Sequence, residues 1–464
     1  MGTLKIDTVK GMDAETLKQL KELVSIFNSH IEANKRKTRY YEGHVTLDEL
    51  NLGIALPESI KNLEIGCEWG AKAVDVLAGR SMFDGFVSTS GQFPSALDRI
   101  ARDNKLFVEY SKAVKDELKL GAAFATLSAD DEIGCKIRFH SGETAAARWN
   151  GEKGRIDCGL AIIDNAKDNN DKKWTPSLLN MYTDDAVYVI RKDNKGWSAE
   201  KHDNPMGRPL MEPLVWNATS KKPFGRSRLK SSVRHLVEGY IRTVANATIG
   251  LEFSTAPQKY LLGISDEQYD SLINDKFRQY VGNILLGTAN ESTGQNPVFG
   301  QLQQGNIEPH VSMMRLLSTQ FSAATGLTVT DVGVVNDANP TSSDAILAQS
   351  QTLVSLAEQL NKCNGDSLRM IARMAQAIAR KCKLEDLSEE ENNVIAHFKN
   401  PAMPSVSATA DAAIKIASAR PDFAKTDTFL EMIGFDQADI RRINSQEQRV
   451  RGLALVEELE NAEE

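Results

Sequence analysis

The chain has 464 residues, a length that suggests about three domains. Its composition is that of a globular protein, with 41% hydrophobic and 25% charged residues and a formal net charge of −8. Because neutralised phosphates supply most of the affinity of a tight, static DNA binder, such proteins are usually basic, and this class is disfavoured. No apolar run approaches the ~20 residues of a membrane span, the N-terminus lacks a signal-peptide pattern, and the five cysteines form no CxxC. We therefore expect a protein of a reducing cytosol with no membrane contact, no disulfide framework and no zinc site.

Helical periodicity dominates the first 120 residues. Residues 13–41 place apolar side chains on one face and end in the basic, aromatic stretch KRKTRYYEG, where a helix C-terminus favours cations. A second helix contains Trp69, Ala73, Val76 and Leu77, with Gly79 and Gly85 after it. Residues 94–119 are predicted to be helical again, with Val108 among the core candidates.

From Gly121 the pattern changes to period two. Seven short runs, from AFATLSA to GWSAEKH, lie between turns rich in Gly, Asp and Asn and predict an antiparallel meander. The following segment, residues 205–227, contains four prolines and suits an extended crossing connection.

The centre of the chain predicts one long amphipathic helix over residues 227–249, with Ser227 as the N-cap. Its polar side carries Lys230, Arg234, Glu238 and Arg242 at four-residue spacing, so that Glu238 can pair with Arg234 and Arg242.

Six cations cluster around the start of this helix, with no acid between Glu212 and Glu238: Lys221, Lys222, Arg226, Arg228, Lys230 and Arg234. The helix dipole disfavours exposed cations there by roughly 0.3–1 kcal/mol each. Three interpretations stay open: a solvated face with ordinary ion pairs, contact with the carboxylates of a neighbouring copy, or contact with nucleic acid.

The C-terminal half is again mainly helical. A helix over residues 311–325 is stopped by Gly326, and a polar, kink-rich loop follows. Ser342, Ser343 or Asp344 caps a further helix, residues 366–381 form another, and three short capped helices start near Ser407, Asp427 and Asp436.

No catalytic motif is present. The chain lacks GxxxxGK[ST], HExxH and GxSxG, and no GxGxxG follows a strand. Acid-rich spots at residues 130–132, 184–185 and 389–391 could hold a divalent ion, but adjacent carboxylates on turns are more often solvated charge. We expect no enzyme activity, no cofactor and no metal.

Several segments together resemble the portal proteins of tailed bacteriophages and prophages, most closely the long-tailed type of Gram-positive hosts. They are, in chain order, RKTRYYEG, WGAKAVDVLAGR, EFSTAPQKYLLG, TGLTVTDVGVVNDANPTSSDAI and the ending from HFKNPAMPS to MIGFDQADIRR. The fourth is the most specific, and in the last Phe398 stands where the family usually has tryptophan. The resemblance covers most of the chain in the right order.

The resemblance implies an α+β portal-like fold with long central stem helices, a mixed α/β wing, a small clip and a helical crown. The implied parts are the N-terminal helices and wing (1–225), the first stem helix (226–253), the clip (254–309), the second stem helix (310–332), the channel or tunnel loop (333–343), the wing helices (344–404) and the crown (405–464). Such a protein does no bond chemistry.

It also implies a ring, usually of twelve subunits, at one vertex of the capsid, through which double-stranded DNA is packaged and ejected. The implied partners are other copies of the chain, DNA, the terminase large subunit, the head–tail adaptor, and the major capsid and scaffold proteins. The implied location is the host cytoplasm during assembly and then the virion.

The implied DNA-contact candidates are Asn336, Asp337, Asn339, Ser342, Ser343, Lys230 and Arg234. Candidates for a subunit interface or for facing an anion are Lys221, Lys222, Arg226, Arg228, Glu238 and Arg242. Two alternatives stay open: a nuclease with an unrecognised metal site, and another phage structural protein such as a minor head protein.

Overall fold

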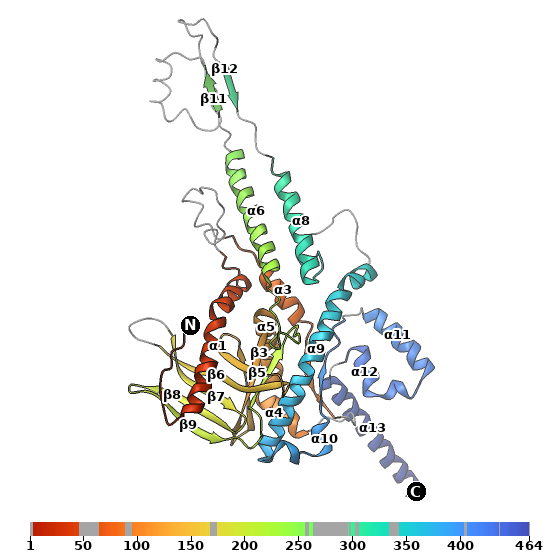
Figure 1. The fold of residues 1–464 in the computed structure, drawn as a ribbon. Coiled ribbons are helices and arrows are strands. Elements are labelled where there is room, and N and C mark those ends of the chain that lie inside the picture. The colour runs from red at the N-terminus through yellow and green to blue at the C-terminus, as the bar shows by residue number, and fades with distance from the viewer. Residues whose placement is uncertain are drawn as a thin grey trace. The chain divides into compact units, whose positions relative to one another are not determined.

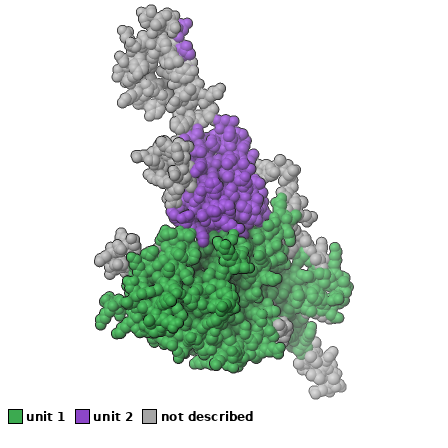
Figure 2. Space-filling view, viewed as in Figure 1, with its two compact units in different colours: residues 1–35, 74–227, 339–464 green, residues 36–73, 228–338 purple. Residues whose placement is uncertain are grey.

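The structure is a computed structural model that describes residues 3–45, 65–88, 95–167, 174–255, 259–262, 296, 298–301, 306–333, 343–402, 406–435 and 437–463. The chain forms two compact units, shown in Figure 2. Unit 1 comprises residues 1–35, 74–227 and 339–464, and unit 2 comprises residues 36–73 and 228–338. The fold is α+β, as predicted. Among the described residues, no helix is both long and apolar enough to cross a membrane.

The largest sheet of unit 1 has six strands in the order β1-β9-β8-β7-β6-β5 (Figure 1). These are β1 (Val9–Lys10), β5 (Ala145–Asn150), β6 (Arg155–Lys167), β7 (Trp174–Thr183), β8 (Ala186–Asp193) and β9 (Gly196–Asp203). Strands β5 to β9 pair antiparallel in chain order, and β1 adds in parallel at the β9 edge. The predicted meander is confirmed for these five strands, and alternation explains why Ala186, Tyr188 and Ile190 are the buried residues of β8.

Helix α1 (Ala14–Tyr41) supplies the apolar partner of this sheet. Asp13 begins the helix by accepting the backbone N–H of Thr16 at 2.9 Å. Further along, Leu20, Leu23, Phe27 and Ile31 are each at most 4% exposed and share one core cluster with strand residues such as Leu160 and Leu179. Each such side chain stabilises the fold by roughly 1.5–3 kcal/mol relative to an exposed one.

The first two predicted strands belong to a separate sheet with the order β10-β3-β4, formed by β3 (Ala122–Asp130), β4 (Gly134–Ser141) and β10 (Met211–Val215). Its strand neighbours pair antiparallel. Strand β10 lies inside the proline-rich segment that we predicted to be only extended. The prediction of a single meander is therefore wrong at this point, because β4 does not pair with β5 and β3 takes β10 as its second partner.

Helices α4 (Ser95–Asp103), α5 (Leu106–Leu120) and α9 (Ser343–Arg380) also belong to unit 1, and α5 and α9 contact this second sheet. The continuous helix predicted over residues 94–119 is broken at Lys105, whose φ is +52°. The Asn104 side chain fixes the break, since it accepts the Ile137 N–H at 2.7 Å and donates to the Cys135 carbonyl at 2.8 Å. After the break Val108 is exposed, so its prediction as a core residue is wrong.

Helix α9 runs unbroken for 38 residues, whereas two helices were predicted over this region. Its buried residues continue at helical spacing through Leu353, Leu360 and Leu368. Gly365 lies inside the helix, where an added Cβ would meet only an ordinary contact with Phe398. The glycine therefore does not mark a helix end. The short η2 (Leu384–Asp386) and α10 (Glu389–Asn392) follow α9.

An aromatic cluster packs on the two-stranded antiparallel sheet of β2 (Phe83–Val87) and β13 (Ile395–Phe398). The ring of Phe83 has four neighbouring rings at centroid distances of 4.9–5.9 Å, those of Phe86, Phe107, Tyr110 and Phe398. Phe398 packs edge-on against both Phe83 and Tyr110. Phe398 is thus a half-buried member of this aromatic cluster.

A buried carboxyl group, that of Glu117, lies between α5 and α9. Asn364 Nδ2 donates to Glu117 Oε2 at 2.8 Å and to the Tyr110 hydroxyl at 3.1 Å, and this hydroxyl shares a hydrogen bond with Ser81. Burial raises the pKa of Glu117 to about 8, so the neutral acid is the form held at pH 7.

The C-terminal segment consists of α11 (Val406–Ala419), η3 (Phe423–Lys425), α12 (Asp427–Ile433) and α13 (Gln437–Glu463). The predicted starts near Ser407, Asp427 and Asp436 are confirmed, but α13 is 27 residues long and not short. His397 of β13 lies between two carboxylates, with Nδ1 3.7 Å from Asp84 of β2 and Nε2 3.6 Å from Glu431 of α12. The nearby Asp84 raises the pKa of His397, and Glu431 adds to this effect.

Unit 2 contains the end of α1, the start of α3 (Trp69–Ala78), α6 (Ser231–Thr255), α8 (Glu308–Thr325) and the antiparallel strands β11 (Lys259–Leu262) and β12 (Val298–Gln301). The predicted stop of α8 at Gly326 is confirmed, and this glycine has φ +72°. The seven-part division implied by the resemblance stays a prediction.

Candidate functional site: the α6–α8 helix pair

Helices α6 and α8 lie side by side in unit 2 and lead towards β11 and β12 (Figure 1). Val237 and Ile241 of α6 and Leu317 and Phe321 of α8 are buried. Gly239 faces α8, since an added Cβ would lie in ordinary contact with Leu317, 3.4 Å from its Cδ2. Gly239 therefore lies on the side of α6 that meets Leu317 of α8.

Trp69 is the aromatic centre of this packing. Its ring centroid lies 4.3 Å from that of Tyr240 and 4.8 Å from that of Phe321, so that one side chain contacts both helices. Trp69 was predicted only as a residue of its own helix. Nothing in the local sequence pattern identifies partners more than 170 residues away.

Arg228 was expected to face an anion or a neighbouring subunit, and this expectation is wrong. Its side chain is buried within the chain, where Nε donates to the Ala73 carbonyl and Nη2 to the Thr325 carbonyl, each at 2.5 Å. Thr325 is the last residue of α8, and its carbonyl has no partner within the helix. Arg228 therefore acts as a C-terminal cap of α8, and burial lowers its pKa to about 10.

Helix α6 starts four residues later than predicted, because the residues before it make tertiary contacts. Helix α6 begins at Ser231, and the hydroxyl of Ser227 donates to the Lys119 carbonyl at 2.5 Å instead of capping the helix. Ser227 is thus held by a tertiary contact within unit 1, and Arg228 by tertiary contacts within unit 2. Their placement depends on these contacts more than on capping preference.

The cations before Ser227 belong to unit 1 and are exposed: Lys221, Lys222 and Arg226. Thr219 and Lys222 exchange backbone hydrogen bonds at 2.8 and 3.1 Å across a turn. Gly225, with φ +64°, follows the turn so tightly that an added Cβ would lie 2.0 Å from the Trp216 carbonyl oxygen. The role of the three cations at an interface stays a prediction.

The remaining cations of the cluster lie in unit 2. Lys230 is exposed and directly precedes α6, and its carbonyl accepts the Arg234 N–H at 3.0 Å. The Arg234 guanidinium donates to the Leu229 carbonyl at 2.8 Å and lies over the Tyr40 ring, 5.7 Å from its centroid. Arg242 is exposed one turn beyond Glu238.

Glu238 does not make the predicted pair with Arg234. Its Oε1 accepts a short hydrogen bond from the Tyr40 hydroxyl, and its Oε2 lies 3.5 Å from Nδ1 of His235. The tyrosine from α1 thus occupies the carboxylate that the sequence spacing offered to arginine. The basic, aromatic end of α1, KRKTRYYEG, contains the tyrosine of this contact, but neither its interpretation as a helix terminus nor its resemblance to portals identified Glu238 as a partner.

The predicted loop contacts fall mostly outside the described residues. This holds for Asn336, Asp337, Asn339 and Ser342. Ser343 is the first residue of α9, but its side chain lies outside the description.

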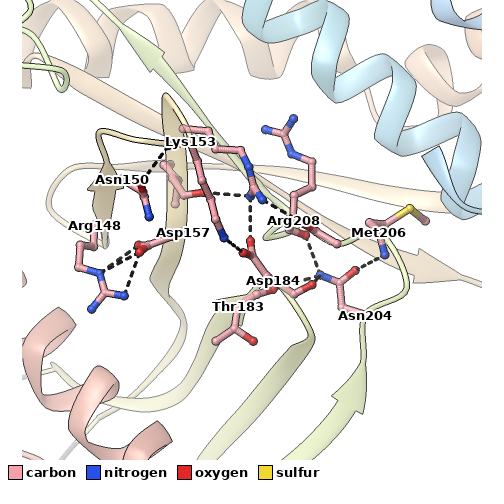
Figure 3. A network of polar contacts seen from close by, with 12 residues as sticks. Arg148, Asn150, Lys153, Asp157, Thr183, Asp184, Asn204, Met206 and Arg208 are labelled. Atoms are coloured by element: carbon pink, nitrogen blue, oxygen red, sulfur yellow. Dashed lines mark hydrogen bonds and ion pairs between the residues drawn. The ribbon is translucent and has the colours of Figure 1, made fainter. Parts of the chain in front are cut away.

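The acid-rich spots form structural contacts. Asp184 accepts from Lys153 at 2.5 Å and from Arg155 at 2.8 Å in the polar network of Figure 3. Asp130 accepts backbone N–H groups of its own turn, and Glu391 pairs with Arg380 at 2.5 Å. Among the residues that the structure describes, no group of three or more His, Cys, Asp or Glu is arranged to hold a metal ion.

No protein-family model and no curated protein matches the chain. In fold it is similar to a chain of the solved structure "Virion of native gene transfer agent (GTA) particle", with a TM-score of 0.42 and 11% identity over 79% of this chain and 89% of that chain. It is also similar to chains of "Neck of empty GTA particle computed with C6 symmetry" (TM-score 0.44, 12% identity, 78% and 88% covered) and "Neck of native GTA particle computed with C12 symmetry" (0.41, 11%, 79% and 89%). At this sequence identity and TM-score, the similarity concerns only the general path of the backbone.

Proposed function

We propose that the chain is the portal subunit of a tailed bacteriophage or prophage. It forms a ring, usually of twelve copies, at one capsid vertex, and double-stranded DNA passes through the ring during packaging and ejection. The proposal is supported by portal-like segments that follow one another in the family's order along most of the chain. The observation that carries it is the pair α6–α8, two long helices packed through Trp69 and separated in the chain by a segment that contains the strands β11 and β12.

In this proposal the protein does no bond chemistry. The terminase large subunit supplies the ATP-driven movement, the head–tail adaptor replaces it later, and the major capsid and scaffold proteins surround the ring during assembly in the host cytoplasm. DNA contacts come from the loop around Asn336 and Asn339 and from Lys230 and Arg234. Lys221, Lys222, Arg226, Glu238 and Arg242 are proposed for contacts with neighbouring copies.

The charge distribution of α8 supports a sliding contact. Between residues 309 and 325 the only Lys, Arg, Asp or Glu is Arg315. Each cation that neutralises a phosphate adds to affinity, so a wall dense in cations would slow a moving duplex. A sparsely charged helix does not slow the duplex in this way, whether it faces the channel or a neighbouring copy.

The native mass of the purified chain, with negative-stain images of the same sample, tests the proposal. A ring of about a dozen 51.1 kDa chains with a central hole is expected. A chain that stays monomeric at high concentration and with scaffold protein present would refute the portal role. Metal-dependent DNA cleavage by that monomer would then support a nuclease, and binding of the monomer to capsids would support a minor head protein.

A further inference from the structure

Two orphaned oxygen atoms lie at the buried contact between helices α5 and α9 of unit 1. Glu117 of α5 and Asn364 of α9 are both fully buried, and Asn364 Nδ2 donates to Glu117 Oε2 at 2.8 Å. The second oxygen of each side chain, Glu117 Oε1 and Asn364 Oδ1, is out of contact with solvent and has no hydrogen-bond partner. Because buried polar groups in proteins are almost always hydrogen-bonded, these two atoms require an explanation.

A single proton on Glu117 Oε1 would satisfy both atoms. An ionised carboxylate can only accept hydrogen bonds, whereas a neutral carboxyl group is also a donor. With the proton on Oε1, Glu117 can donate to Asn364 Oδ1 while its Oε2 accepts from Nδ2 of the same amide. The ionised form leaves both oxygens unsatisfied and buries a charge against one hydrogen bond, which is costly.

The surroundings of Glu117 do not favour its ionised form. Among the described residues, no charged group of α4, α9 or the strands β2, β3, β4 and β10, which contact α5 or belong to the same contact, makes an ion pair with Glu117. Its titratable neighbours are Tyr110 of α5, which accepts from Asn364 at 3.1 Å, and Cys363 of α9. Desolvation and the nearby Glu117 raise the pKa of both neighbours, so both stay neutral while Glu117 titrates.

We propose that Glu117 and Asn364 form a proton-dependent clasp between α5 and α9, closed by a proton on Glu117 Oε1 and opened when that proton is lost. In the closed form two hydrogen bonds join the helices and no charge is buried. On opening, the O–H bond of Oε1 breaks and the proton passes to hydroxide in the solvent. Oε1 and Asn364 Oδ1 are then two acceptors without a hydrogen between them, and this contact of α9 with α5 loosens.

The effect of opening is local, because a second bond holds the same stretch of α9. Ser367, one turn after Asn364, donates from its hydroxyl to the Pro213 carbonyl of β10 at 2.7 Å. This bond contains no group that titrates near neutral pH. Loss of the proton should therefore loosen α9 around Asn364 without detaching the helix from the sheet β10-β3-β4.

The first test is a double-mutant cycle on the full-length chain, with Glu117→Leu and Asn364→Leu alone and together, measured by denaturant unfolding at pH 7 and pH 9. With a pKa of about 8, the acid exceeds the carboxylate by about tenfold at pH 7, and the ratio is inverted at pH 9. The favourable coupling between the two side chains should be present at pH 7 and lost at pH 9. An amide that merely donates to an ionised carboxylate predicts the opposite, because hydrogen bonds to charged groups are stronger. Coupling that is equal at both pH values, or that grows with pH, would overturn the proposal.

Infrared spectroscopy tests the proton directly and does not require the leucine variants to fold. The difference spectrum between the unmodified chain and Glu117→Gln should contain the C=O band of a protonated carboxyl group at pH 7 and carboxylate bands at pH 9. Glu132→Gln, at an exposed turn of unit 1, is the matched control and should give the same difference spectrum at both pH values. Carboxylate bands of Glu117 at pH 7 would refute the clasp.

Amide hydrogen exchange shows whether the proton controls the helix contact. The side-chain amide of Glu117→Gln can donate to Asn364 Oδ1 at every pH, so this variant keeps the clasp closed. Between pH 7 and pH 9, exchange of α9 around Asn364 should quicken in the unmodified chain by more than the intrinsic increase, and Glu117→Gln should lack this additional increase. The same increase in both chains would show that the contact does not depend on the proton, and would overturn the proposal.

Discussion

Replacement of Arg228 tests how far a buried cation can stabilise a helix end. In Arg228→Met the unbranched stem remains, while the two donors to the carbonyls of Ala73 and Thr325 are removed. Ala73 lies inside α3, where its carbonyl has a partner four residues later in the helix. Thr325 ends α8, so its buried carbonyl is left without a donor.

The expected change in the free energy of unfolding is the difference between the hydrogen bonds lost and the desolvation penalty recovered when the cation is removed. Hydrogen bonds from a charged group contribute about 1.5–3 kcal/mol each, which gives a loss of about 3–6 kcal/mol for two. Burial lowers the pKa of Arg228 from 12.5 to about 10. At about 1.4 kcal/mol per pKa unit, removal of the cation recovers about 3 kcal/mol. We therefore expect Arg228→Met to lower the free energy of unfolding by about 0–3 kcal/mol. Arg228→Ala should lower it by roughly a further 1.5–3 kcal/mol, because the buried stem is removed too.

Thermal unfolding followed by circular dichroism, with amide hydrogen exchange of α8, measures both effects. The exposed Arg226→Met is the control and should change stability by less than about 0.5 kcal/mol. Because a chain with two units need not unfold in one step, the exchange of the last turn of α8 is the decisive readout. Slower exchange in Arg228→Met than in the unmodified chain would show that the burial cost outweighs the hydrogen bonds, and would refute the reasoning.

Three further changes have definite expected outcomes. The carboxyl group of Glu117 keeps its proton in the folded state, whereas the unfolded chain releases it near pH 4.5. The free energy of unfolding should therefore fall as the pH rises from 4.5 to about 8. Melting temperatures of Glu117→Gln, measured over the same pH range, should lack this decrease. The pKa of His397 is raised in the folded state, so its ion pair with Glu431 should form at acid pH and disappear as the pH rises past the folded pKa. Amide exchange of α12 should therefore quicken with pH by more than the intrinsic increase in exchange rate. Glu431→Gln should abolish this additional increase. Gly225→Ala should destabilise unit 1 by at least about 1–3 kcal/mol in denaturant titrations, whereas Gly151→Ala, which meets nothing within 4 Å, should not.

Sequence periodicity predicted most of the elements, because the spacing of apolar residues within each element reflects which of its side chains are buried. The strands of the six-stranded sheet alternate, and α1 and α8 present an apolar face at helical spacing, so their existence follows from local pattern. Sheet membership did not follow, since the choice of β10 as partner of β3 depends on residues about 90 positions later in the chain. The helix break at Lys105 depends likewise on contacts of Asn104 with β4.

The candidate site was predicted only in its composition. The sequence shows a run of cations without acids, but it does not show which of them are buried. Arg228 finds its acceptors 155 and 97 residues away, and Tyr40 finds Glu238 at a distance of 198 residues. Pairing rules within one helix predicted Arg234 with Glu238, and a tertiary hydrogen bond replaced that pair.

Arg228 and Arg234 show why this segment of unit 2 stays electropositive. One is buried and satisfied by carbonyl oxygens, the other is half-buried and held by a carbonyl and an aromatic ring. Carbonyls and rings hold a cation through partial charges, so neither interaction removes the net charge as a carboxylate would. A protein whose formal charge is −8 thus keeps a local positive field at the start of α6. Such a field is screened within about 10 Å at 0.1 M salt. An anion that uses it must therefore reach the helix surface, as a duplex in a narrow channel does and a distant acidic surface does not.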